Sequence, residues 1–250
     1  MSPVLIEAKE KLLNLLAGRK LLDEHVEVRM DSLSVEQAIG TPVRQDFPLL
    51  TGREVMVEAA VRGSFGQAFT ECPTSFSGKL SEVLDMGLQE PGGRTVFVAT
   101  LNAVMRYLGI IAQTRHCRDE EPEECAGQIA CYLKQNYGGV KVGIIGFQPA
   151  ILESLADCFG ADRVQCGDLN PGNIGKVRSG VRIADGEKNN ALLIDKSDVV
   201  LVTGSSMVNG TFDAIRQLAE VKKKKLIVFG VTGRGVSNLL GLESICFRAH

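Results

Sequence analysis

Tryptophan is absent from this sequence, and the three aromatic residue types together supply only 5% of its 250 residues. The core of such a chain must therefore be mainly aliphatic. Histidine is scarce as well, and His25, His116 and His250 stand in no recognisable nucleophile setting. A G-x-S-x-G elbow is also missing, since Gly204-Ser205-Ser206-Met207 lacks the second glycine. The sequence is thus poorly supplied for a catalytic triad.

Neither an excess of one charge nor a long apolar run is present. The formal net charge is −2, which provides no electrostatic footprint for nucleic acid or for an anionic membrane. No apolar run approaches the length of a membrane span, and no apolar signal core follows Met1-Ser2-Pro3. With 44% hydrophobic and 23% charged residues, the composition is that of a soluble globular protein. We expect neither a nucleic-acid partner nor a membrane partner.

Paired cysteine spacing is also missing. The seven cysteines form neither a disulfide framework nor a tight C-x-x-C motif, which favours a cytoplasmic protein with free thiols. His116, Cys117, Cys125 and Cys131 offer soft ligands for a metal, but seven and five residues separate the successive cysteines. That spacing is wider than the one that usually nucleates a zinc site. Ordinary thiols in a reducing compartment are the alternative interpretation.

The first half of the chain mixes short strand patterns with helical ones. Apolar residues at helical spacing predict an amphipathic helix over 4–16, and partial alternation predicts a strand over 24–33. Residues 54–70 predict two strands joined by a tight turn, and 80–88 and 95–111 predict helices. This half is therefore predicted to form a small, mostly antiparallel sheet with helices.

The segment HCRDEEPEE at 116–124 is polar, acidic and broken by proline, and is the best domain boundary in the chain. We expect an N-terminal α+β domain over 1–115, an acidic linker and connecting helix over 116–138, and an α/β domain over 139–250.

The second half alternates strands with helices, which indicates a parallel sheet with right-handed crossovers. Four or five strands fit the pattern. Residues 167–190 are rich in Gly, Asn and Asp and predict a loop long enough to suggest a functional role. The predicted elements of this half are strands at 141–146, 163–166, 198–203, 226–231 and 245–248 and helices at 149–159, 212–220 and 236–240.

A glycine loop follows the first of these strands. It occupies the position of a dinucleotide phosphate loop, but Gly143-Ile144-Ile145-Gly146-Phe147-Gln148-Pro149 has the pattern G-x-x-G-x-x-P in place of G-x-G-x-x-G. Phe147 would also crowd a pyrophosphate that approached the backbone. Asp168, after the next strand, fits either the acidic position of that template or an ordinary turn. The departures disfavour NAD binding.

A second loop, Thr203-Gly204-Ser205-Ser206, follows the buried strand 198–203 and leads to Asn209-Gly210-Thr211. In a doubly wound sheet the two loops flank one crevice at the topological switch point, where open α/β sheets bind ligands. Free backbone N–H groups at the start of the helix near Thr211 would favour an anionic ligand. The alternative is that Thr211 only caps its helix and Asn209-Gly210 only turns the chain.

Several of these stretches resemble, in their order along the chain, the family described as "putative heavy-metal chelation", once catalogued only as a domain of unknown function. They are Gly66–Thr70, Leu101–Ala103, Lys141–Pro149 and Asp198–Thr211, the last ending in Asn209-Gly210-Thr211. The resemblance implies a small N-terminal α+β domain, similar to the N-terminal domain of enolase, followed by a Rossmann-like parallel-sheet αβα domain. It also implies a pocket between the two domains and a homodimer.

By position, the resemblance implies a ligand pocket formed by Asn102, Gly146, Phe147, Gln148, Pro149, Thr203, Gly204, Ser205, Ser206, Asn209 and Thr211. We expect a cytoplasmic protein that binds a small polar ligand there, and the family description suggests a heavy metal, a transition metal or a metal chelate. No catalytic residue or metal-ligand set follows from the residues alone. Two alternatives stay open: an enzyme acting on a nucleotide-like or adenosyl-containing substrate, and an oligomeric interaction module without a small-molecule site.

Overall fold

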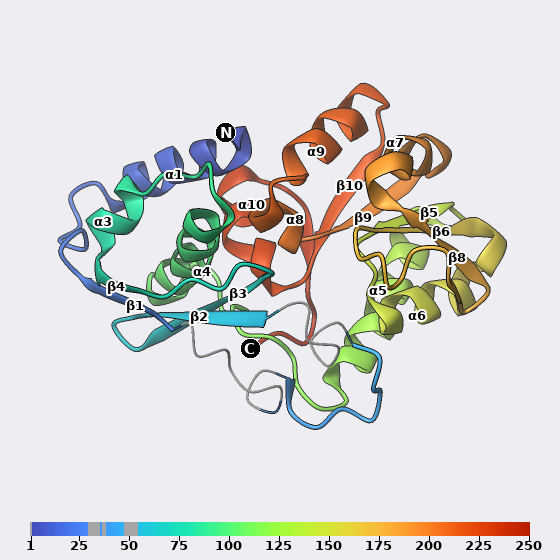
Figure 1. Cartoon of the computed structure of the whole chain (residues 1–250), viewed down its shortest axis with the longest axis horizontal. Coiled ribbons are helices and arrows are strands. Elements are labelled where there is room, and N and C mark those ends of the chain that lie inside the picture. Colours follow the sequence, from blue (N-terminus) through green and yellow to red (C-terminus); the bar gives the residue numbers. More distant parts are fainter. Residues whose placement is uncertain (1, 30–35, 37–38, 48–54) are drawn as a thin grey trace.

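Two β-sheets, one antiparallel and one mostly parallel, organise the chain (Figure 1). The computed structural model describes residues 2–29, 36, 39–47 and 55–250. The predicted α/β class, with an α+β first half and a parallel-sheet second half, is confirmed. No helix in the described part of the chain is both long enough and apolar enough to cross a membrane.

The N-terminal sheet has the strand order β3-β2-β1-β4, and each neighbouring pair is antiparallel. The predicted strand 24–33 is observed as β1, while its residues 30–33 lie outside the described residues. Strand β4 is missing from the sequence-based prediction. The elements of this half are α1 (Pro3–Leu16), β1 (His25–Arg29), β2 (Val55–Val61), β3 (Ser64–Thr70), β4 (Phe76–Lys79), α3 (Leu80–Asp85) and α4 (Pro91–Tyr107).

Helix α4 is buried along most of its length. Pro91 begins it, where the missing N–H costs nothing, and every residue from Arg94 to Met105 is buried. Strand β3 lies directly on its backbone, because a Cβ added at Gly66 would stand 2.2 Å from the Ala103 nitrogen. Only glycine permits that approach.

The second sheet has the strand order β11-β10-β9-β5-β6-β8-β7 and is parallel except for the edge pair β7–β8. Its elements, with those that cover it, are α5 (Glu121–Tyr137), β5 (Val142–Ile145), α6 (Pro149–Phe159), β6 (Val164–Asp168), β7 (Val177–Arg178), β8 (Val181–Asp185), α7 (Gly186–Lys196), β9 (Val199–Thr203), α8 (Ser205–Asn209), α9 (Phe212–Val221), β10 (Lys225–Phe229), α10 (Arg234–Leu240) and β11 (Ser244–Ile245). From β5 the chain builds outward through β6 and β8, then returns to the other side of β5 as β9. The switch point predicted between the strands 141–146 and 198–203 is confirmed.

The predicted long loop at 167–190 is wrong. This stretch contains the hairpin of β7 and β8 and the start of α7, so the sheet has seven strands in place of four or five. Val181 and Ile183 bury alternate side chains in β8, and Asp185 caps α7 by accepting from the Glu187 and Lys188 backbone N–H groups. The last predicted strand is also shorter, since β11 covers only Ser244–Ile245.

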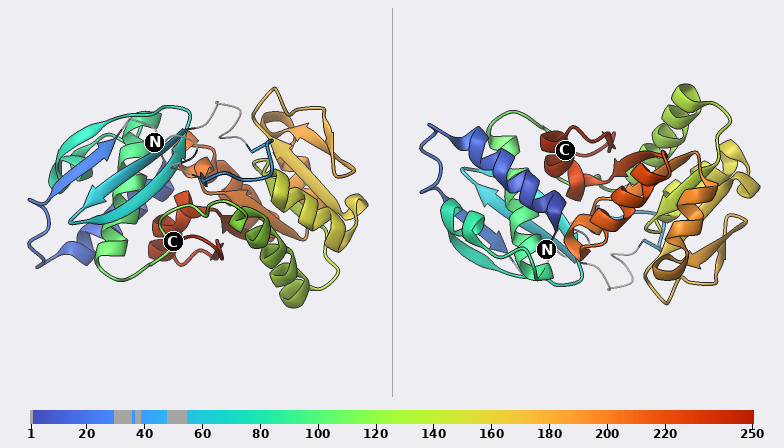
Figure 2. Two further views of the ribbon diagram at one scale, coloured as in Figure 1. Left: turned by 90° about the horizontal axis from the view of Figure 1, so that it is seen from below. Right: turned by 90° about the horizontal axis from the view of Figure 1, so that it is seen from above.

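Helices cover both faces of the parallel sheet, α5 and α6 on one side and α7 and α9 on the other (Figures 1 and 2). The face under α5 and α6 has its own cluster of buried apolar residues. The opposite face shares a single cluster with α1, α4 and the N-terminal sheet, so that Val202 and Val236 belong to the same core as Val57 and Leu101. The two sheets are therefore joined by hydrophobic packing. The domain boundaries at 115 and 139 stay a prediction.

Candidate functional site

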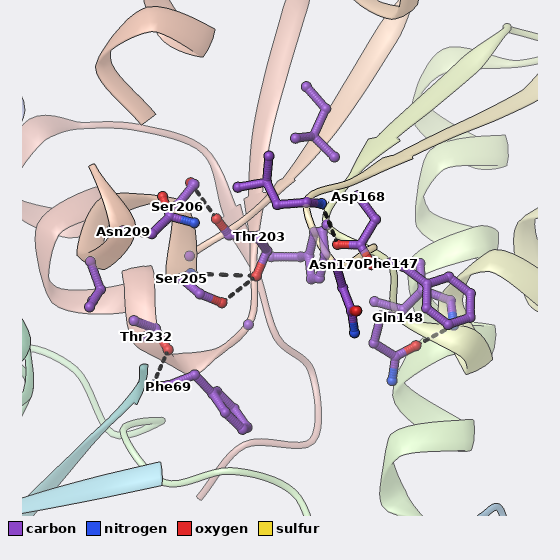
Figure 3. A pocket seen from close by; sticks show the side chains of 18 of the residues that line it. Phe69, Phe147, Gln148, Asp168, Asn170, Thr203, Ser205, Ser206, Asn209 and Thr232 are labelled. Atoms are coloured by element: carbon purple, nitrogen blue, oxygen red, sulfur yellow. Dashed lines mark hydrogen bonds between the residues drawn. The ribbon is translucent and has the colours of Figure 1, made fainter. Parts of the chain in front are cut away.

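A cavity of about 520 Å³ opens at the carboxyl ends of β5, β6, β9 and β10, where the switch point lies (Figure 3). Its size is within the range of small-molecule sites in proteins. Side chains from the two sides of the switch point face each other across it. Thr203 and Ser205 stand on the β9 side, and Asp168, Asn170 and Gln148 stand on the side of β5 and β6.

Nine of the eleven residues predicted from the sequence line this cavity: Gly146, Phe147, Gln148, Thr203, Gly204, Ser205, Ser206, Asn209 and Thr211. Pro149 does not line it and is buried in the first turn of α6. Asn102 does not either. Whether any of the nine contacts a ligand stays a prediction.

Asn102 is a fully buried structural link. Its Nδ2 donates to the carbonyl oxygens of Gln67, Val231 and Thr232 at 3.0, 3.3 and 3.1 Å, and its Oδ1 accepts from the Gly235 N–H at 2.8 Å. These bonds use its hydrogen-bonding groups and tie α4 to β3, to the turn after β10 and to α10. Asn102, which the resemblance assigns to the pocket, therefore does not line the cavity but holds together the elements next to it.

Two glycines allow the loops at the switch point to approach closely. Gly146 has φ +95°, and a Cβ there would stand 2.4 Å from Thr203 Cγ2. A Cβ at Gly204 would stand 2.3 Å from the Gly233 nitrogen, in the turn after β10. Glycine is needed at both positions for the backbones of three neighbouring loops to form one wall.

The hydroxyl groups at the end of β9 and the start of α8 are all hydrogen-bonded. The Ser206 hydroxyl donates to the Thr203 carbonyl at 2.6 Å, and the Thr203 and Ser205 hydroxyls share a hydrogen bond of 2.9 Å. A one-turn helix, α8, begins here, where the sequence predicts an open glycine loop. The serines are thus fixed by helix geometry while Ser205 still faces the cavity (Figure 3).

Asn209 and Thr211 form a turn at the edge of the cavity. Asn209 Oδ1 accepts from both the N–H and the hydroxyl of Thr211, at 3.0 and 2.8 Å. Thr211 stands at the N-cap position of α9, but its side chain makes no capping hydrogen bond to the helix, so the alternative in which Thr211 only caps its helix is not supported. The guanidinium of Arg94, buried on α4, donates to the carbonyl oxygens of Val208 and Asn209 and holds this turn in place.

Polar side chains after β6 form the opposite wall. Asp168 accepts from the Leu169 N–H and from Asn173 Nδ2, at 2.9 and 2.6 Å. Asn190, on α7, has a buried Oδ1 for which the described residues supply no hydrogen-bond donor. Of these cavity residues, only Asp168 could be named from the sequence. The Asn-rich run after β6 is the signal that could have indicated Asn170 and Asn173, whereas Asn190 depends on the position of α7.

Gln148 has one engaged and one uncommitted end. Its Oε1 accepts from the Ile151 N–H at 2.6 Å and so caps α6. No described residue accepts from its Nε2, which leaves that donor for the cavity it lines. Its neighbour Phe147 is buried and contributes an apolar surface.

A third wall carries thiols and an imidazole. His116, Cys117, Cys125 and Cys246 all line the cavity, whereas Cys131 is exposed and lies outside it. His116 Nδ1 lies 2.6 Å from the Cys117 carbonyl and donates to it, which leaves Nε2 as the unprotonated ring nitrogen. Burial lowers the pKa of His116 and raises that of Cys117. Cys246, which stands beyond β11, could not have been grouped with the others from spacing.

These donors do not form a metal site in the structure. Among the described residues no group of three His, Cys, Asp or Glu side chains is placed to hold a metal ion. The cavity therefore has hydrogen-bonding and apolar walls but no ready ligand set for a bare cation.

The chain is similar to one protein family and to solved structures from it. Residues 131–239 match the model of the family described as "Putative heavy-metal chelation", DUF364. A crystal structure of a DUF364 protein of unknown function from Pyrococcus horikoshii is 18% identical, with a TM-score of 0.57 over 92% of this chain and 80% of that one. Another, from Desulfitobacterium hafniense DCB-2, is 14% identical with a TM-score of 0.47, over 74% of this chain and 72% of that one. No curated protein matches.

At 18% identity the likeness to the Pyrococcus horikoshii protein shows a shared fold alone. The family match covers β5, β9 and both loops of the switch point. The predicted resemblance to the heavy-metal chelation family DUF364 is thereby confirmed over residues 131–239.

Proposed function

We propose that this protein binds a small polar organic ligand in the cavity at the β5–β9 switch point. The observation that carries the proposal is a cavity of about 520 Å³ whose walls hold uncommitted hydrogen-bonding atoms. Asn190 Oδ1 is buried without a donor, and Gln148 Nε2 has no acceptor among the described residues. A buried polar atom without a partner costs free energy, which a bound ligand can recover.

The walls suit a ligand with both polar and apolar parts. Phe147 and Phe229 supply buried apolar surface, while Thr203, Ser205 and Asp168 supply hydroxyl and carboxylate oxygens. Such walls fix a ligand's orientation through a few hydrogen bonds and obtain affinity from the apolar contacts. These groups suit holding a ligand, and the proposal is limited to binding.

The family description suggests a heavy metal as the ligand. Because the described residues hold no group of three metal-ligating side chains, a heavy metal would have to enter as a chelate that brings its own ligands. Elemental analysis of protein purified without an affinity tag, followed by titration, tests this. If neither a transition metal nor its chelate binds better to the wild type than to a Ser205→Ala/Asn209→Ala double variant, a heavy metal is the wrong ligand.

A nucleotide-like or adenosyl-containing ligand is the second candidate, favoured by Asp168. This carboxylate stands at the end of β6, the strand beside β5, as an acidic residue does in dinucleotide-binding folds. Each of its oxygens accepts one bond from the protein and keeps capacity for a ligand hydroxyl. A thermal-shift screen of nucleotides, dinucleotides and S-adenosylmethionine tests this candidate, since a tight ligand raises the unfolding temperature.

Mass spectrometry of the protein under native conditions, followed by extraction, identifies any small molecule that accompanies it. For a ligand found in this way, we expect Asn190→Ala to weaken binding about tenfold, the loss of about one buried hydrogen bond. Asn189→Ala is the matched control, because Asn189 is adjacent on α7 but bonds to the Asp185 carbonyl and does not line the cavity. Equal affinities of the two variants would contradict the proposed site.

We also propose a homodimer in a reducing, cytoplasmic compartment. All seven cysteines are free, which supports a reducing compartment. Light scattering coupled to size-exclusion chromatography tests the dimer. An oligomer that binds nothing in either screen would support the remaining alternative, an interaction module without a small-molecule site.

A further inference from the structure

The charged side chains that line the cavity are of one sign. Asp168, at the end of β6, and the exposed Glu71 both line it, whereas no lysine or arginine among the described residues does. His116 adds no positive charge, because burial lowers its pKa. A concave site with low-dielectric walls strengthens the field of such charges. We therefore expect a negative potential in the cavity.

Phosphate sites at the ends of parallel strands use free backbone N–H groups of glycine loops, and here those groups are engaged. Each glycine that follows β5, β9 or β10 donates its N–H to a carbonyl oxygen of the neighbouring strand. The pairs are Gly146–Gly167 at 2.8 Å, Gly204–Phe229 at 2.9 Å and Gly230–Ile245 at 3.3 Å. The Thr211 N–H likewise donates to the Ser206 carbonyl, at 3.0 Å. These N–H groups are not available to an anion.

The two long helices that begin at this edge of the sheet are capped by the chain itself. At the start of α6, the Ile151 N–H donates to Gln148 Oε1 at 2.6 Å. At the start of α7, two N–H groups donate to the Asp185 carboxylate, whose charge also offsets the positive end of the helix dipole. A phosphate would therefore gain little at either helix.

The same edge holds acceptors that lack donors. Asn190 Oδ1 is buried without a donor among the described residues, and it stands 2.8 Å from the position of a Cβ added at Gly167. Gly167 directly precedes Asp168, so the unpartnered oxygen and the carboxylate belong to one wall. Each oxygen of Asp168 accepts one hydrogen bond from the protein and can accept another. A protonated amine supplies both the donors and the charge that this wall lacks.

We propose that the ligand of this cavity is an organic cation whose protonated amine lies against Asp168 and Asn190. The inference rests on the proposed function, since it names the chemical class of the ligand for that site. Ligands whose charged groups are only phosphates or carboxylates are disfavoured, because Asp168 repels them and no described lining residue compensates.

The test measures the charge preference of the cavity with thiol reagents. Ser205→Cys puts a thiol on the β9 side, facing the cavity (Figure 3). The reduced protein is treated with methanethiosulfonates that bear a protonated amine, a sulfonate or no charge, and peptide mapping gives the rate at each cysteine. We expect the ratio of the cationic to the anionic rate to be about tenfold higher at the introduced thiol than at the exposed Cys131.

Two carboxylate variants test the source of this preference. Asp168→Asn in the Ser205→Cys background should lower the ratio about threefold, whereas Asp157→Asn should leave it unchanged. Asp157 is the matched control because it is an exposed aspartate on α6 that does not line the cavity. Thr203→Cys provides a second reporter on the same wall if Ser205→Cys does not fold.

A ratio no higher than that at Cys131, or one that Asp168→Asn does not change, would overturn the inference. Failure of all the reagents to label the introduced thiol would do the same, because such a cavity is closed to an organic cation. A co-purified phosphate ester or carboxylic acid without an amine would contradict this inference and leave the proposed function standing. The rate ratios need no bound ligand, so they give their answer even if the search for a co-purified molecule contradicts the proposed function.

Discussion

The buried amide of Asn102 serves four backbone groups at once, on β3, on the turn after β10 and at the start of α10. No solvent reaches these groups, since Asn102 and its partner Gly235 are buried. The net gain from each hydrogen bond is small, but removing the side chain would leave several buried backbone groups without a partner, which costs more free energy of unfolding. Its value to the cavity is that it fixes the turn that carries Thr232 beside the site.

Replacement of Asn102 by alanine should therefore destabilise the protein strongly. We expect a loss of about 3 kcal/mol in the free energy of unfolding, because several buried backbone groups lose their partner. Urea denaturation measures it. The control is Asn136→Ala, on the exposed end of α5, where we expect a change within about 0.5 kcal/mol. Similar losses in the two variants would show that the buried hydrogen bonds of Asn102 contribute little to stability.

Gly146 should resist substitution for two separable reasons. Gly146→Ala introduces a Cβ at positive φ and also 2.4 Å from Thr203 Cγ2, and we expect it to cost about 2–4 kcal/mol. Gly63→Ala is the matched control for the first reason alone, since Gly63 has φ +77° and nothing within 4 Å of an added Cβ. Its cost should be about 1–2 kcal/mol.

Adding Thr203→Ser to Gly146→Ala should recover part of the loss, because it removes the contacting methyl group and leaves the backbone strain. Urea denaturation of the three variants measures each contribution. No recovery in the double variant would show that the loops at the switch point do not approach as closely as described.

At the scale of elements, the start of α6 allows the effects on stability and on ligand binding to be measured separately. Gln148 Oε1 caps this helix, while Nε2 is left for the cavity. Gln148→Ala should lower the free energy of unfolding by about 1 kcal/mol, whereas Gln148→Ser should retain the cap and the stability. Both variants remove Nε2. If the amide contacts the ligand, calorimetric titration will show the two variants weakened alike despite their different stabilities.

The elements that could be predicted from the sequence are those whose pattern is local. Helix α1 has apolar residues at helical spacing, and strands β5 and β9 are short continuous apolar runs. The loops after the two strands carry glycines whose positions indicate the switch point. Strand β8 and helix α7 could not be found in the same way. Their apolar residues are few, and their glycines and asparagines, which usually indicate a loop, here provide tight turns and the Asn190 side chain.

The candidate site divides in the same way. Thr203 and Gln148 follow directly from the ends of predicted strands. Cys246 lines the cavity only because the C-terminal tail folds back onto α5, a contact between distant parts of the chain that no local pattern encodes.

The stability of the whole molecule should depend on pH because His116 is buried. Burial keeps its pKa below the ordinary value of about 6.5, so between the two values the unfolded chain binds a proton that the folded chain does not. Stability must therefore fall as the pH is lowered below about 6.5, by at most about 1.4 kcal/mol per pH unit for this one group. His116→Gln should flatten the decline between pH 6.5 and pH 5 in thermal unfolding.

His25→Gln, which removes an exposed histidine from β1, is the control for that measurement. An unchanged decline in His116→Gln would show that His116 is not held neutral in the folded protein.

The apolar cluster that joins the two sheets also bears on the kinetics of ligand exchange. Separating the halves about a hinge would expose Leu101, Val202 and Met207 to water, so the protein should behave as one rigid body around its cavity. Ligand entry and exit then depend on local side-chain and loop motions, which take nanoseconds to microseconds, and not on domain closure over microseconds to milliseconds. Residence time at this cavity would accordingly report the strength of the contacts within it.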